Sequence, residues 1–114
     1  QLGCMDAVAL KLSKFGGLSF MLRARDLCLD LGVKMCIEDT WGSDITTGIA
    51  LHLAAAMPLS AIMNVCDLSG YVGPRLDSSM PTRDGGYITP STVSGIRFNP
   101  NLDLLGALVL ELSA

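Results

Sequence analysis

The stretch that decides the fold runs from Val8 to Pro58 and reads VALKLSKFGGLSFMLRARDLCLDLGVKMCIEDTWGSDITTGIALHLAAAMP. Short apolar runs alternate here with longer segments whose apolar residues recur at helical spacing. The runs at 6–12 and 33–37 have the length and composition of strands buried on both faces, and a third such run follows at 61–65. Strands that alternate with helices predict a parallel sheet with right-handed crossovers.

The first intervening segment predicts a helix. Apolar residues from Phe20 to Leu31 recur on one face, and charged residues fall mostly on the others. Ser19 stands where a helix N-cap is expected. Gly32 follows the last apolar position, as a glycine that ends a helix does.

The second intervening segment, 45–57, is apolar nearly all round and predicts a helix covered on most sides. Ser43 is a candidate cap, Asp44 suits the positive end of the helix dipole, and Pro58 ends the helix. His52 lies in the middle of this segment among apolar neighbours. A structural role is therefore expected for it.

Residues 68–114 have a different character, because prolines and glycines mark irregular loops there. The last apolar segment, 102–112, fits a helix or a strand equally well. Three parallel strands cannot close a sheet, and a (β/α)₈ barrel takes about 250 residues. The pattern therefore predicts an α/β fold that holds less than half of such a barrel.

Composition excludes several classes of protein. Of the 114 residues, 50% are hydrophobic and 17% are charged, and 8 Lys and Arg against 11 Asp and Glu give a net charge of −3. No basic face for nucleic acid is expected, and the apolar content argues against disorder. No signal peptide is visible, and Pro58 interrupts the longest apolar stretch before it reaches the about 20 residues of a membrane span. We expect a soluble, cytoplasmic chain.

Four cysteines stand at positions 4, 28, 36 and 66, without a C-x-x-C pair. With His52 as the only histidine, they lack the clustered spacing of a zinc site. The regular apolar elements are unlike those of a small disulfide-bonded scaffold. Reduced, buried thiols are therefore predicted.

The predicted strands end in Lys11, in Glu38 and Asp39, and in Cys66 and Asp67. These ends share one edge of a parallel sheet, where active sites form. Two interpretations of Lys11 stay open. A buried amine with a lowered pKa can act as a proton-transfer base or a Schiff-base nucleophile. Alternatively, Lys11 forms a structural ion pair with Glu38 or Asp39.

Three further features have paired interpretations. Lys14 is either a solvated charge or one that orients a substrate. Gly16 and Gly17 permit an anion to approach a helix N-terminus, although a tight turn explains them equally well. Trp41 is either a wall of the site or an anchor of its loop.

Residues 11–17 (KLSKFGG) form a K-x-x-K-x-G-G signature, and residues 38–42 read EDTWG. Together with the helix between them, they resemble the last third of the barrel in the mandelate racemase/muconate lactonizing branch of the enolase superfamily. The resemblance places Lys11 at the end of barrel strand six as the acid/base residue. EDTWG then ends strand seven, in a form most similar to hydroxyproline epimerases and dehydratases, and NVCDL (64–68) ends strand eight.

The resemblance implies a partial (β/α)₈ TIM barrel and a Mg²⁺-dependent reaction. Residues 1–73 would hold barrel strands six to eight, and 74–114 would form a tail against the rest of the barrel or a capping domain. The reaction removes the proton α to a carboxylate, in a racemase, epimerase or dehydratase of amino-acid-like or hydroxy acids. Lys11 would move the proton while the metal offsets the charge of the enolate.

The resemblance also implies roles for the acidic residues. Glu38 or Asp39 would orient Lys11 or contact a substrate amine, and Asp67 is a weaker candidate for that contact. The metal ligands of the family lie on barrel strands three to five, so none is expected here, and the 114 residues alone are expected to be inactive.

The expected partners are a small carboxylate substrate and further copies of the parent enzyme, with no nucleic acid and no membrane. Two other functions stay open at this stage. One is a Schiff-base aldolase-type barrel that uses Lys11. The other is a non-catalytic remnant whose exposed sheet edge pairs with another chain.

Overall fold

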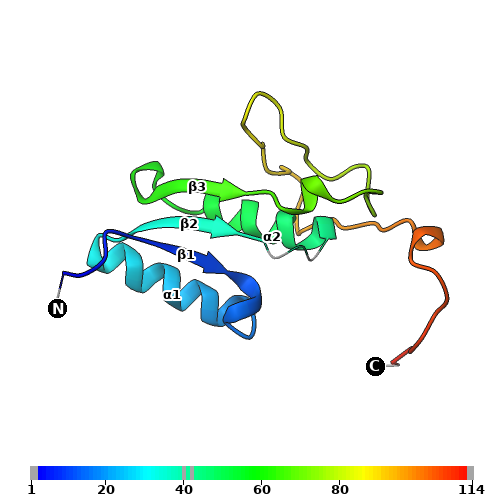
Figure 1. Ribbon diagram of the computed structural model, residues 1–114, viewed down its shortest axis with the longest axis horizontal. Helices are drawn as coiled ribbons and strands as arrows, with labels where there is room; N and C mark the ends of the chain where they lie inside the picture. The colour runs from blue at the N-terminus through cyan, green and yellow to red at the C-terminus, as the bar shows by residue number, and fades with distance from the viewer. Residues whose placement is uncertain (1–2, 40, 42, 113–114) are drawn as a thin grey trace.

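Three parallel strands and two α-helices form the regular part of the computed structural model, which describes residues 3–39, 41 and 43–112 (Figure 1). The strands are β1 (Ala7–Lys11), β2 (Lys34–Glu38) and β3 (Ile62–Cys66), in the sheet order β1-β2-β3. The helices are α1 (Leu18–Leu31) and α2 (Ser43–Ala55). The predicted α/β fold and its alternation of strands and helices are confirmed.

The register of the sheet brings the three strand ends to one edge. Lys11 is paired with Glu38 across β1 and β2, and Glu38 is paired with Cys66 across β2 and β3. The pairing of β2 with β3 shifts between Met35 and Cys36. The last residues of all three strands therefore form one row at the carboxyl edge.

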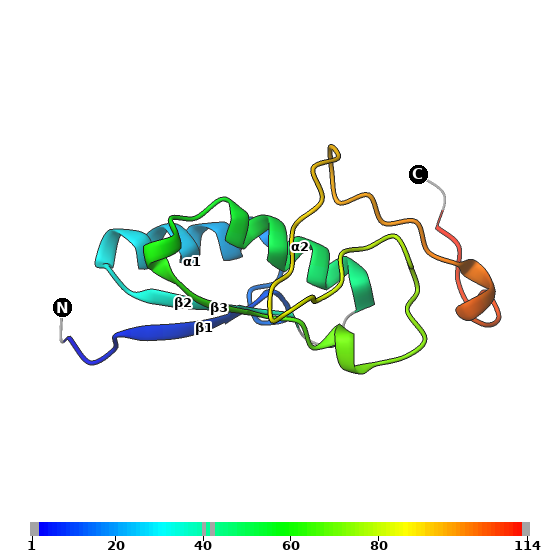
Figure 2. The ribbon, with the colours of Figure 1, turned by 90° about the horizontal axis from the view of Figure 1, so that it is seen from above.

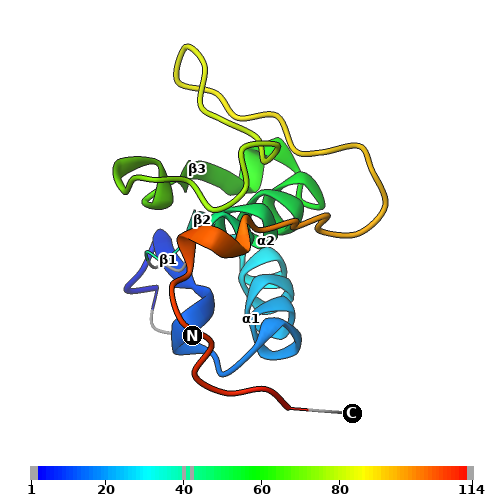
Figure 3. The same cartoon turned by 90° about the vertical axis from the view of Figure 1, so that its right-hand side faces the viewer.

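Both helices lie on the same face of the sheet, as Figures 2 and 3 show from two directions. In β2, Met35 and Ile37 are fully buried in the core shared with the helices. Cys36 and Glu38 alternate with them, so they lie on the opposite face, where they are half-buried. Among the described residues, no helix or strand covers that opposite face.

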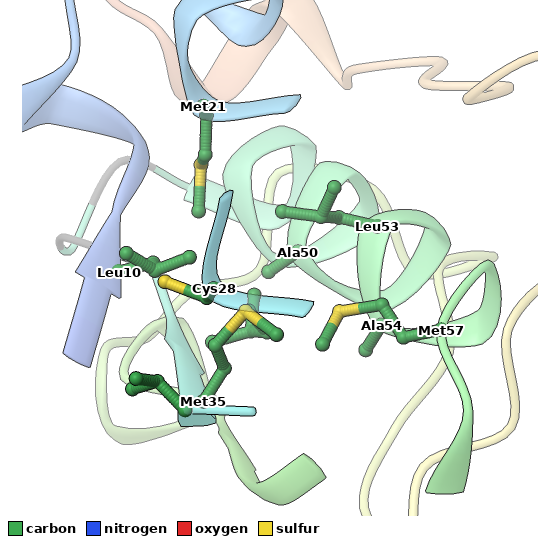
Figure 4. Packing of buried hydrophobic residues seen from close by; sticks show 10 residues of the cluster. Leu10, Met21, Cys28, Met35, Ala50, Leu53, Ala54 and Met57 are labelled. Carbon is green, nitrogen blue, oxygen red and sulfur yellow. The ribbon is translucent and has the colours of Figure 1, made fainter. Parts of the chain in front are cut away.

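The core lies between the sheet and the two helices (Figure 4). Each fully buried apolar side chain there stabilises the fold by about 1.5–3 kcal/mol. The cluster comprises Leu10, Met21, Cys28, Val33, Met35, Ile37, Ala50, Leu53, Ala54 and Met57.

Helix α1 ends as predicted but begins differently. Gly32 has a left-handed backbone with φ 69° and donates its N–H to the carbonyl oxygens of Cys28 and Leu29. The prediction of Ser19 as N-cap is wrong, because the cap position belongs to Gly17 and the helix begins at Leu18. Gly17 has φ 139°, a conformation that favours glycine, so the chain turns into the helix before it reaches Ser19.

Helix α2 begins at Ser43, two residues before the predicted start, and Asp44 lies in its first turn as expected. The tail after β3 is irregular, as predicted. Its last apolar segment forms only a 3₁₀ turn at Leu102–Leu104 and is otherwise without regular structure through residue 112. Its side chains are exposed, Val109 to 95%, so burial favours neither a helix nor a strand there. No described helix is long and apolar enough to cross a membrane.

Candidate active site

Lys11 and Glu38 form an ion pair at the carboxyl edge of the sheet, on the face that the helices leave open. The Nζ atom of Lys11 lies 2.8 Å from Oε2 of Glu38, and the two side chains are 38% and 18% exposed. The strand register places these residues directly opposite each other. The interpretation of Lys11 as the partner of Glu38 is therefore confirmed.

The ion pair also determines the protonation of Lys11. The hydrogen bond to Glu38 and the negative charge of that carboxylate raise the pKa of Lys11 above its ordinary value of 10.5. The lowered pKa expected for a lysine at this position is wrong for this structure, because the partner outweighs the effect of burial. Lys11 is thus a cation here, and it can accept a proton only after it has lost one.

Two thiols adjoin this pair. Sγ of Cys36 donates a hydrogen bond to Oε1 of Glu38 at 3.5 Å, and Cys66 is paired with Glu38 in register. Burial, followed by the hydrogen bond to Glu38, raises the pKa of Cys36 to about 11. Burial and the charge of Glu38 also raise the pKa of Cys66. Both thiols are neutral near pH 7 and surround Glu38 without adding charge.

Cys66 was predicted at the same edge as Glu38, whereas Cys36 was not predicted as its neighbour. Lys34, Cys36 and Glu38 alternate along one strand, and this period of two was the available signal.

Asp39, the residue after β2, is fully buried. Its Oδ2 atom accepts hydrogen bonds from the hydroxyl of Thr47 at 2.6 Å and from the backbone N–H and hydroxyl of Ser69, both at 3.1 Å. Its Oδ1 atom accepts from the N–H of Leu68 at 2.9 Å. Both oxygens are thus used to join β2, α2 and the turn after β3. The contact of Asp39 with a substrate amine stays a prediction.

Trp41 and Tyr71 form an exposed aromatic pair beyond the strand ends. Their ring centres are 6.3 Å apart, and the two residues are 58% and 65% exposed. The guanidinium of Arg83 lies 5.2 Å from the centre of the Tyr71 ring. The assignment of Trp41 as a wall of the site stays a prediction. Thr40 and Gly42, which belong to the EDTWG block, lie outside the described residues.

A polar network attaches the tail to the start of α2. Oδ1 of Asp44 accepts from Nε and Nη2 of Arg75 at 3.0 and 2.7 Å, and Oδ2 accepts from the N–H of Asp77 at 3.2 Å. Asp77 accepts in turn from the N–H of Asn99 at 2.6 Å, and its hydrogen bonds lower its pKa. A cavity of about 210 Å³, lined in part by Trp41 and Arg75, lies beside this network.

The remaining predicted residues lie around this edge or away from it. Lys14 is exposed at the end of the 3₁₀ turn that follows β1. Asp67 is half-buried, and its Oδ1 accepts from the N–H of Gly70 at 2.9 Å, so it shapes the turn after β3. His52 of α2 lines a mostly apolar hollow between the two helices, together with Leu22 of α1 and Ile49 of α2. This position agrees with a structural role.

Within the part of the chain that the structure describes, no three His, Cys, Asp or Glu side chains are grouped so that they could hold a metal ion. The carboxylates of Glu38, Asp39 and Asp44 are engaged by Lys11, by α2 with the turn after β3, and by Arg75. The side chains present here therefore do not fit a Mg²⁺ site.

Comparison with known families gives this edge its context. A family model described as enolase C-terminal domain-like matches residues 1–103. The chain therefore belongs to the enolase superfamily, in the mandelate racemase/muconate lactonizing group, as its motifs predicted. Its three parallel strands and two helices are a part of the barrel of that group.

Individual relatives agree with this assignment. The chain is 38% identical over 109 residues to a cis-3-hydroxy-L-proline dehydratase from Roseibium aggregatum, a match that covers 96% of the chain and 30% of the relative. A mandelate racemase/muconate lactonizing enzyme from Roseovarius nubinhibens ISM superposes with a TM-score of 0.82 at 32% identity, covering 90% of the chain and 28% of that protein.

A second structure from the same organism and group, complexed with magnesium, gives a TM-score of 0.84 at 31% identity, covering 92% of the chain and 29% of that protein. The chain thus spans less than a third of the length of these relatives.

Proposed function

We propose that the protein containing this chain removes the proton α to the carboxylate of a cyclic amino acid, and that cis-3-hydroxy-L-proline is its substrate. The observation that carries the proposal is Lys11, placed at the carboxyl edge of the sheet and paired with Glu38 at 2.8 Å. The dehydratase that is 38% identical to the chain supports the choice of substrate. The reaction is that of a lyase or, if the proton returns to the same carbon, of an isomerase.

Glu38 couples substrate binding to the charge of Lys11. The ring nitrogen of hydroxyproline is a secondary ammonium at neutral pH, and it would compete with Lys11 for the carboxylate of Glu38. Loss of that partner lowers the pKa of Lys11. Lys11 then gives up its proton more easily, and we propose that its deprotonated amine is the base next to the bound substrate.

The atoms balance in a dehydration. Lys11 takes the proton from C2, and the electron pair of the broken C–H bond moves toward the carboxylate. The pair then forms the C2–C3 double bond and expels hydroxide from C3, which takes a proton from the Lys11 ammonium and leaves as water. In an epimerisation, Lys11 keeps the proton that it took, and a second acid, proposed to lie outside the described residues, delivers a proton to the opposite face of C2.

Dependence on Mg²⁺ is part of the proposal, supported by the relative complexed with magnesium. A bound Mg²⁺ would supply Lewis-acid stabilisation of the negative charge on the substrate carboxylate. Its ligands are proposed to lie outside the described residues. Because the chain covers 30% of its dehydratase relative, we propose that the 114 residues alone are inactive.

The other predicted substrate contacts remain part of the proposal. Trp41 would stand against the substrate ring, because aromatic faces attract cations. Asp67 and Lys14 would contribute charge at the rim of the site. The tail from residue 74, with exposed apolar side chains such as Leu108 and Val109, would pack on the rest of the barrel or a capping domain.

The test uses the whole protein with Mg²⁺ and compares cis-3-hydroxy-L-proline with mandelate, a hydroxy acid that lacks the ring nitrogen. We expect the proline to be consumed, EDTA to stop the reaction, and Lys11→Met to reduce kcat by at least about 1,000-fold, since the base is removed. Consumption of the substrate that persists in Lys11→Met would contradict the proposal. So would a reaction that is insensitive to EDTA and in which borohydride traps the substrate on Lys11. The borohydride result would favour the aldolase-type reaction.

A further inference from the structure

Asp39 is a fully buried carboxylate at the point where the chain leaves the sheet. We propose that Asp39 is a positioning residue, which joins the β2–α2 connection to the turn after β3 and thereby holds Trp41 against Tyr71. We call the hydrogen bonds that Asp39 accepts from Thr47, Leu68 and Ser69 the Asp39 clamp, and this clamp does not depend on a substrate. Its effect on catalysis rests on the proposed function, in which Trp41 contacts the substrate ring.

The hydrogen bonds of Asp39 reach two separate segments. Thr47 belongs to α2, whereas Leu68 and Ser69 come 29 and 30 residues after Asp39, at the turn after β3. The Ser69 hydroxyl also lies 3.0 Å from the carbonyl oxygen of Ser43, at the start of α2. A carboxylate only accepts hydrogen bonds, and every group facing Asp39 is a donor. One side chain thus satisfies donors from two connections at once.

The clamp sits at the base of both aromatic residues. Trp41 follows Asp39 by two positions, and Tyr71 follows Ser69 by two positions. Burial does not hold the rings, because Trp41 is 58% and Tyr71 is 65% exposed. The backbones that carry the two rings therefore contribute to their separation of 6.3 Å, together with the contact of Arg83 with the Tyr71 ring.

The backbone conformations of Trp41 and Ser43 also support a positioning role for Asp39. Trp41 has φ 59° and Ser43 has φ 77°, both in the left-handed region that non-glycine residues rarely adopt. Such conformations persist only where the surroundings enforce them. The hydrogen bonds of Asp39 and Ser69 lie on either side of this strained connection and provide that constraint.

Asp39→Asn tests the clamp at constant side-chain size. An amide offers one acceptor oxygen, so in either orientation its NH₂ group faces a backbone N–H, from Leu68 or from Ser69. Asp67→Asn is the matched control, because the hydrogen bond that Asp67 accepts from Gly70, the one recorded for it among the described residues, can go to an amide oxygen. The readout is the near-UV circular dichroism and fluorescence of Trp41, the single tryptophan of the chain.

In the full chain we expect Asp39→Asn to reduce the Trp41 dichroism at least twofold and to make its fluorescence more accessible to acrylamide, with unchanged far-UV dichroism. Asp67→Asn should match the wild type. If Asp39→Asn fails to fold, Thr47→Val, which removes one donor, should change the same signal less. An unchanged Trp41 signal in a folded Asp39→Asn or Thr47→Val variant would overturn the clamp.

A kinetic measurement separates positioning from general stability. In the whole protein, Asp39→Asn should lower kcat/KM up to about 100-fold, mainly through KM, because a displaced wall weakens substrate placement. A variant that melts at a lower temperature but keeps KM and the Trp41 signal would overturn the positioning role. Absence of any turnover by the wild type would overturn the proposed function alone, since the spectroscopic test stands without substrate.

Discussion

Glu38 controls the charge at the carboxyl edge because its two oxygens contact different partners. Oε2 pairs with Nζ of Lys11 at 2.8 Å, and Oε1 accepts from Sγ of Cys36 at 3.5 Å. Both contacts retain a proton on the partner, so the pKa of Lys11 and the pKa of Cys36 are raised together. A change at this one residue should therefore be measurable at both neighbours.

Glu38→Gln should lower the pKa of Lys11 toward its ordinary value of 10.5, because it removes the negative charge that holds the proton. The pair stabilises the folded chain fully below that ordinary pKa, and this stability is lost as the pH rises through the raised pKa. Side-chain NMR titration of Lys11 measures the shift. Glu111→Gln, the same change at an exposed position, should leave the titration unaltered. A Lys11 titration identical in all three proteins would contradict the coupling.

Cys36 should react slowly with iodoacetamide. At pH 9.0, where an ordinary thiol is half ionised, a pKa of about 11 leaves roughly 1% as thiolate, the reactive form. We expect alkylation of Cys36 about 50-fold slower in the folded chain than in denaturant, measured by peptide mass spectrometry. In Glu38→Gln the rate should rise but stay below that of the unfolded chain, since burial is the larger cause. Equal rates in the folded and unfolded chain would refute the raised pKa.

At the scale of elements, β2 is the strand on which the fold depends, because it lies between β1 and β3 and beneath both helices. Its side chains Met35 and Ile37 are fully buried, whereas β3 lies at the edge of the sheet and exposes Met63 to 59%. The two neighbouring strands thus each carry a methionine, which is buried in β2 and exposed in β3.

Met35→Ala should lower the free energy of unfolding by about 2–5 kcal/mol, the range for deleting a large buried side chain. Met63→Ala should change it by less than about 0.5 kcal/mol, as surface substitutions do. Urea unfolding followed by far-UV circular dichroism measures both. Equal losses in the two variants would mean that the core is not where the sheet meets the helices.

The elements also show how far sequence reasoning reaches. Apolar runs and helical spacing predict the order of strands and helices, because burial imposes those periods. The start of α1 was missed, since the positive φ of Gly17 depends on the turn and not on the nearby serine. The hydrogen bonds of Asp39 were missed because their donors at Leu68 and Ser69 lie 29 and 30 residues away. No local pattern connects residues that only the fold brings together.

At the scale of the whole molecule, the carboxyl edge carries both the candidate site and the attachment of the tail. The tail leaves β3 at this edge and extends past the sheet (Figure 1). Arg75 and Asp77 bind the Asp44 carboxylate at the start of α2, which ties the tail to the helix layer. The Asp44 carboxylate is therefore one point at which the tail is attached to α2.

Arg75→Gln should lower the free energy of unfolding by about 2–3 kcal/mol, because Asp44 stays buried without its cation. The helix dipole and the 28% exposure of Arg75 keep the loss below that of a fully buried pair. Arg25→Gln is the control for an exposed carboxylate, since Arg25, itself 17% exposed, makes the same two-point contact with Asp26, which is 59% exposed. That change should cost less than about 0.5 kcal/mol in urea unfolding. Similar losses would show that the tail attachment adds nothing beyond a surface pair.

The most direct test of the central claim follows the C2 proton itself. The whole protein is incubated with cis-3-hydroxy-L-proline and Mg²⁺ in D₂O, and proton NMR records replacement of the C2 hydrogen by deuterium in the substrate and its epimer, or loss of the C2 proton signal on dehydration. This readout covers epimerisation and dehydration alike, because both begin with the same proton transfer. With the wild type we predict deuterium at C2 of the substrate or its epimer, or loss of the C2 proton signal as the dehydrated product forms. With a folded Lys11→Met variant we predict neither change. Proton loss at the same rate in the wild type and in Lys11→Met would contradict the assignment of Lys11 as the base.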